Sequence, residues 1–171
     1  MARTKADKNS PEYLERKRMT GRSTLMLIMA FTLVNLVFLM TDLNTYFLFS
    51  AAAPYYGTLF CLEWSGWNPG DTLVMGALLF DAVVLAVYFL CWILSKNGAG
   101  WLIAATVLFL LDTLALLTVP VFFYITYGDI LVDLLFHIWA IVELIQAVVS
   151  ARKLQQADAP VNLQYTNPEN F

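Results

Sequence analysis

The sequence predicts an all-α fold in which four helices cross a membrane as a bundle. Of the 171 residues, 60% are hydrophobic and 13% are charged, whereas a soluble domain carries about 25% charged residues. The hydrophobic residues are concentrated in four runs, each close to the ~20 residues that a helix needs to cross ~30 Å of hydrocarbon. All ten lysines and arginines lie outside these runs. We therefore expect one integral membrane domain.

The positions of the basic residues predict the topology. Seven lie within residues 3–22, Lys96 separates the second and third apolar runs, and the last two, at 152–153, follow the fourth run. The other two connections, 42–71 and 127–130, contain acids but no lysine or arginine. Because basic residues accumulate on the cytoplasmic side, we expect a multi-pass protein of the plasma (inner) membrane with both termini in the cytoplasm. The same rule, with attraction to anionic lipid, explains the basic N-terminus, so no nucleic-acid partner is expected.

Three regions are expected along the chain. Residues 1–22 form a cytoplasmic segment, in which a short amphipathic surface helix begins with Ser10 as N-cap and Pro11 at its first position. Residues 23–151 form the transmembrane domain, with Pro120 kinking or ending its third span. Residues 152–171 form a flexible cytoplasmic tail. The four spans are expected at about residues 23–40, 72–94, 101–123 and 130–151, and the short connections predict that the last three are antiparallel neighbours.

The connection 42–71 is the longest and is itself largely apolar. Counting it as a fifth span would place residues 152–153 outside, against the charge rule. We therefore expect an outer interfacial or re-entrant segment that folds back onto the bundle as a lid. Pro54 is expected to break any helix there into two short pieces. Its acids, Asp42, Glu63 and Asp71, predict an acidic outer mouth that attracts cations.

Five ionisable residues fall inside the predicted spans. Each is expensive in hydrocarbon, and such residues are functional candidates by default. Asp81 and Asp112 both lie near the predicted midplane and are expected to face the bundle interior and approach each other. Asp133 and His137 are four residues apart and share one helix face. The predicted ligand- or cation-binding candidates are Asp81, Asp112, Asp133, His137 and Glu143.

Three interpretations of these residues remain open. They can be polar contacts that hold the helices together, a site for a cation, proton or polar ligand, or part of a catalytic centre. As a metal ligand, His137 would need carboxylate partners, and as a catalytic base it would be oriented by Asp133. The sequence has no zinc-protease or serine-hydrolase motif around it, so no cofactor, metal site or catalytic residue is assigned. Cys61 and Cys91 are expected near opposite membrane faces, too far apart for a disulfide.

These observations rank three functions. The leading prediction is non-catalytic binding of a partner, a lipid or a small polar ligand within the bundle. The alternative is a small cation- or proton-coupled transporter or channel component that uses the intramembrane acids. The third is an enzyme acting on lipid at the outer face. The expected partners are the lipid bilayer and either a partner membrane protein or further copies of the same chain.

One stretch also carries a resemblance. Residues 45–56, Thr-Tyr-Phe-Leu-Phe-Ser-Ala-Ala-Ala-Pro-Tyr-Tyr, resemble part of small four-span membrane proteins of Gram-positive bacteria. The stretch is under a tenth of the chain, and it transfers no catalytic residue. The resemblance implies a bacterial multi-pass bundle.

Overall fold

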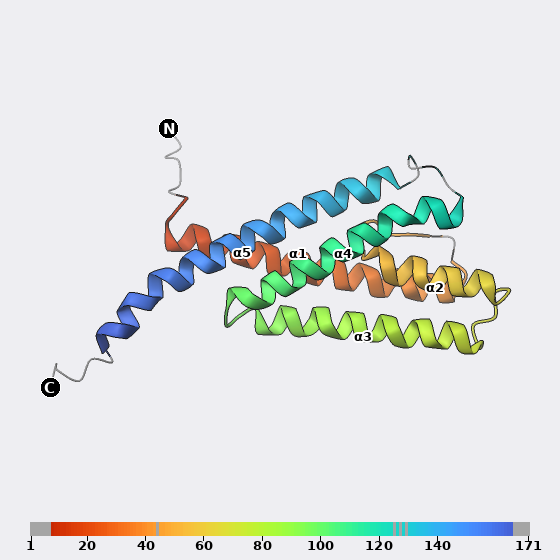
Figure 1. Cartoon of the computed structure of the whole chain (residues 1–171), viewed down its shortest axis with the longest axis horizontal. Helices are drawn as coiled ribbons and strands as arrows, with labels where there is room; N and C mark the ends of the chain where they lie inside the picture. The colour runs from red at the N-terminus through yellow and green to blue at the C-terminus, as the bar shows by residue number, and fades with distance from the viewer. Residues whose placement is uncertain (1–7, 44, 125, 127, 129, 166–171) are drawn as a thin grey trace.

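The computed structural model describes residues 8–43, 45–124, 126, 128 and 130–165, with side chains as far as residue 157. These residues form five helices and no strand (Figure 1). Four of the helices are long and apolar enough to cross a membrane, and the fifth, α2, is shorter. The predicted all-α four-span membrane bundle is therefore confirmed. The helices are α1 (Pro11–Met40), α2 (Ala52–Trp64), α3 (Thr72–Leu94), α4 (Ala99–Phe123) and α5 (Leu131–Tyr165).

Helix α1 begins where the capping pattern predicted. The Ser10 side chain accepts a hydrogen bond from the Tyr13 N–H at 3.3 Å, and Pro11 occupies the first helical position. The helix then continues for 30 residues without interruption, so the predicted surface helix forms the first turns of α1. A physical reason is that the Arg22 guanidinium donates to the Ser95 hydroxyl at 3.0 Å, which ties this part of α1 to the end of α3.

Helix α5 also extends beyond its predicted end. We expected residues 152–171 to be a flexible tail, but α5 is helical to Tyr165. Residues 166–171 lie outside the described part of the chain. The first turn past residue 151 is fixed by a hydrogen bond from Lys153 Nζ to the Asn9 side chain at 2.9 Å.

The spans pack in the expected order. Helix α3 is followed by α4 after a short connection, α4 packs against α5, and α5 packs along α1 (Figure 1). At the crossing of α1 and α5, Gly21 is buried and lies directly against Ala147. Small residues at such crossings let membrane helices approach closely.

The connection between α1 and α3 re-enters the bundle. After α1 ends at Met40, a non-helical limb (residues 45–51) runs back along the bundle, and α2 returns to the end from which the limb came (Figure 1). Helix α2 packs against α1, α3 and α4. The lid thus folds onto the bundle as expected. The expectation that Pro54 divides it into two helices is wrong, because Pro54 lies in the first turn of one continuous helix, where proline is tolerated.

The α1–α5 crossing yields a test. A methyl group added at Gly21 would overlap Cβ of Ala147, whereas one added at Gly76 of α3 would meet open space. We expect Gly21→Ala to destabilise the protein by about 1–3 kcal/mol through overpacking. Gly76→Ala should be neutral or slightly stabilising, because alanine favours helices. Thermal unfolding in detergent checks this; equal midpoints for the two variants would contradict the close crossing.

Candidate functional site

The start of α2 is the point of the re-entrant segment at which backbone N–H groups most need hydrogen-bond acceptors from other helices. A helix leaves its first four backbone N–H positions without partners inside the helix, here residues 51–54. The N–H of Ala51 donates to the Thr32 hydroxyl at 2.8 Å. The next two N–H groups donate to the two carboxylate oxygens of Asp112, at 2.9 and 2.8 Å. The fourth position is proline, which has no N–H, so every donor at the start of this helix is accounted for.

Asp112 acts as an N-cap supplied by another helix. The N-cap residue of α2, Ala51, makes no side-chain capping bond of its own. Asp112 stands thirteen residues after the start of α4 and eleven before its end, which places the start of α2 near the middle of the spans. It is 6% exposed. A carboxylate at a helix N-terminus also interacts favourably with the helix dipole, by up to about 2 kcal/mol in partly buried sites.

His137 binds the same carboxylate. Its Nε2 lies 3.1 Å from Asp112 Oδ2, and its Nδ1 lies 2.8 Å from the backbone oxygen of Asp133. The ring is fully buried and stacks on Phe109, with 4.8 Å between ring centroids. Because a carbonyl oxygen can only accept, Nδ1 must donate. The contact between Nε2 and Asp112 then contains one proton, and the pair is neutral overall whichever partner holds it.

The limb that leads to α2 is held by Asn35 of α1. The Asn35 amide nitrogen donates to the Phe47 backbone oxygen at 2.7 Å and to the Ser50 hydroxyl at 2.9 Å. Its amide oxygen accepts from the Phe47 N–H at 2.8 Å. Asn35 and Thr32 were not among the predicted site residues. Their signal in the sequence is that two polar, hydrogen-bonding residues stand three apart on one face of the first span.

The Asp133 carboxyl lies near Tyr46 of the limb and near Tyr55 and Tyr56 of α2. The carboxyl forms a hydrogen bond with the Tyr46 phenol, whose hydroxyl also lies 3.2 Å from the Ser50 hydroxyl. Burial, assisted by the Asp133 carboxyl, raises the pKa of Tyr46 far above its usual value. The phenol therefore keeps its proton and remains a donor.

Asp81 contacts α2 at a different place. Its Oδ2 accepts a hydrogen bond of 2.6 Å from the Thr58 hydroxyl, and the residue is 2% exposed. Asp81 and Asp112 both face the interior, as expected. However, Asp112 binds the first turn of α2 and Asp81 binds Thr58, so each acid has its own partner on α2 and no described hydrogen bond links them.

Glu143 is separate from the other candidates. It pairs with Lys17 of α1 at 3.7 Å, close to the crossing of α1 and α5. Between His137 and Glu143 on α5 lies Ala140, which is buried in an apolar cluster with Leu25 and Phe109. The structure therefore joins the side chains of Asp112 and His137, with only the backbone oxygen of Asp133 contacting His137. Asp81 is connected to the same helix α2, and Glu143 lies apart.

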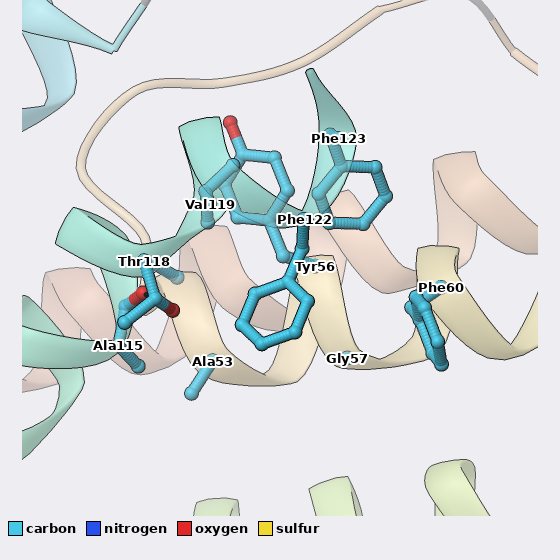
Figure 2. A pocket seen from close by; sticks show the side chains of 10 residues that line it. Ala53, Tyr56, Gly57, Phe60, Ala115, Thr118, Val119, Phe122 and Phe123 are labelled. Carbon is cyan, nitrogen blue, oxygen red and sulfur yellow. Dashed lines mark hydrogen bonds between the residues drawn. The ribbon is translucent and has the colours of Figure 1, made fainter. Parts of the chain in front are cut away.

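A groove lies beside the first turns of α2. It is a cavity of about 340 Å³ between α2 and α4, within the usual range of ligand sites. Aromatic side chains of both helices, Phe122 among them, gather beside Ala53 and Gly57 (Figure 2). Its lining is apolar except for Thr118, whose hydroxyl donates to a backbone oxygen, and the Tyr56 phenol. The lining residues are Ala52, Ala53, Tyr56, Gly57, Phe60, Ala115, Thr118, Val119, Phe122 and Phe123.

The capping role of Asp112 can be tested against a matched aspartate. Asp112→Asn retains only one oxygen, so one N–H of α2 loses its acceptor, which costs about 1–3 kcal/mol when the group is buried. Asp71 caps α3 through the Leu73 N–H at 2.8 Å, in an exposed turn where asparagine caps as well as aspartate. We expect Asp112→Asn to lower the midpoint of thermal unfolding in detergent and Asp71→Asn to leave it nearly unchanged. Equal effects would contradict the cap.

The chemistry available to this cluster is that of a helix cap: its carboxylates and ring nitrogens face backbone N–H groups, hydroxyls and each other. Within the described residues, no three side chains of His, Cys, Asp or Glu are grouped closely enough to hold a metal ion. Cys61 and Cys91 are free thiols. Comparison of the chain with protein-family models, curated proteins and solved structures gives no significant match.

Proposed function

We propose that this multi-pass membrane protein is non-catalytic and binds a lipid chain in the groove between α2 and α4. The observation that supports this proposal is the groove itself, a cavity of about 340 Å³ with an almost wholly apolar lining. Its floor is the first turn of α2, which Asp112 fixes near the middle of the spans. Phe60 and Phe122 on its walls are 43% and 63% exposed. The groove is therefore accessible from the surroundings of the bundle, which at this depth are hydrocarbon.

The binding proposal is favoured over transport by how the acids are used. A path for a cation or proton would join Asp133 to Glu143, and the buried apolar residue Ala140 stands between them. Asp112 is occupied by two backbone N–H groups and His137. Transport and outer-face catalysis remain the alternative functions. Neither is supported by a structural feature comparable to the groove.

Filling the groove tests the proposal. Gly57 and Gly76 are both helical glycines at which a side chain would meet open space, but only Gly57 lines the groove. We expect wild-type protein and Gly76→Phe to retain about one lipid when released from nanodiscs and weighed by native mass spectrometry, and Gly57→Phe to lose it. Retention of lipid by Gly57→Phe at the wild-type level would show that the groove is not the binding site.

The proposal places the protein in the plasma (inner) membrane with both termini in the cytoplasm, so that the groove opens to the outer leaflet. The support is the segregation of lysine and arginine, none of which lies between Arg22 and Lys96 or between Lys96 and Arg152. A thiol reagent that cannot cross membranes tests the orientation. In a background without Cys61 and Cys91, Pro69→Cys should react on intact cells and Lys8→Cys only after lysis. The reverse pattern would contradict the orientation.

A further inference from the structure

We propose that the lipid held in the groove carries an ammonium group in its headgroup. This inference rests on the proposed lipid-binding function and adds the chemical class of the ligand. It draws on three features of the described residues: the length of α2 beside the groove, the side chains at the outer end of α2, and the sign of charge on that side of the protein.

The length of α2 matches one leaflet. From Ala53 on the groove floor to Glu63 near the end of α2 there are ten residues, or about 15 Å at 1.5 Å per residue. This is half of the ~30 Å hydrocarbon thickness of a bilayer. A chain seated on the floor would therefore bring its headgroup to the level of Glu63.

Two side chains stand at that level on the groove side of α2. Glu63 and Trp64 follow the groove residue Phe60 by three and four residues, and such positions share a helix face. Glu63 is exposed, Trp64 is 77% exposed, and the Trp64 ring packs on Phe60 with centroids 6.1 Å apart. A carboxylate attracts an ammonium, and an indole face binds one through a cation–π interaction.

The charge on the predicted outer side of the protein also favours a lipid with an ammonium headgroup. The chain has no lysine or arginine between Arg22 and Lys96 or between Lys96 and Arg152, so the predicted outer surface offers no cation to an anionic headgroup. Asp42, Glu63 and Asp71 lie on that side. An anionic lipid such as phosphatidylglycerol would meet repulsion at the groove mouth, whereas an ammonium-bearing lipid would meet a carboxylate.

The experiment is native mass spectrometry of the full chain from nanodiscs containing equal amounts of phosphatidylethanolamine, phosphatidylcholine and phosphatidylglycerol with identical acyl chains. We expect one or both ammonium lipids to be retained over phosphatidylglycerol by about two- to fivefold, the size of one exposed charge contact. Glu63→Gln should abolish this preference. Asp42→Asn, which removes an outer-side charge away from the groove lining, should preserve it.

The possible results distinguish a wrong headgroup class from a wrong assignment of lipid binding to the groove. Two results would contradict an ammonium headgroup and leave lipid binding in place. One is that phosphatidylglycerol is retained as well as or better than the ammonium lipids. The other is that the preference for ammonium lipids is unchanged in Glu63→Gln. Loss of lipid in Gly57→Phe should affect all three classes alike. Absence of retained lipid in the wild-type protein, or a dimer that retains none, would overturn the proposed function itself.

Discussion

The structure depends on the capping of a helix that begins near the middle of the spans. A backbone N–H without a partner costs several kcal/mol in hydrocarbon, so a re-entrant helix is stable only where the bundle provides acceptors. Here Thr32 of α1 and Asp112 of α4 provide them, and Pro54 removes the remaining donor. His137 contacts the capping carboxyl group through its Nε2 at 3.1 Å. The presence of an aspartate and a histidine deep in the spans is explained by this requirement.

The cap and the groove share their residues. Ala52 and Ala53 donate their N–H groups to Asp112 and also line the groove. Their small side chains allow the first turn of α2 to approach α4 closely and leave the space that the aromatic residues surround. Asp112 is thus a positioning residue for the groove, because it fixes the depth and direction of α2 without touching the space where a lipid chain would lie.

Hydropathy and charge predicted most of the fold. The second span was expected at 72–94 and is α3 (Thr72–Leu94). Its apolar run is interrupted only by the acid Asp81, and the polar residues Asp71 and Ser95 mark both of its ends. The return of the 42–71 segment followed from the charge rule. The continuity of α1 and the length of α5 were not foreseen, since both depend on tertiary contacts such as Arg22 with Ser95 and Lys153 with Asn9.

The sequence predicted that Asp81 and Asp112 face the interior, but it did not predict the groups that they contact. The burial of Asp81 and Asp112 was predicted from their depth in the spans. The expectation that they approach each other assumed that a buried acid has another side chain of the spans as its partner. Their partners are instead a hydroxyl and two backbone N–H groups of α2, and backbone donors leave no mark in a side-chain pattern. Asn35 was passed over because a single amide in an apolar run gives no indication of which backbone it binds.

The central claim, that Asp112 caps α2 within the bundle, is tested most directly by NMR of alanine-labelled protein in detergent. The amide protons of Ala52 and Ala53 should exchange slowly with solvent and resonate downfield, as charge-assisted hydrogen bonds require. Both signals should move in Asp112→Asn and stay in place in Asp71→Asn. Fast exchange of these two amides, or signals that ignore the Asp112 substitution, would contradict the account.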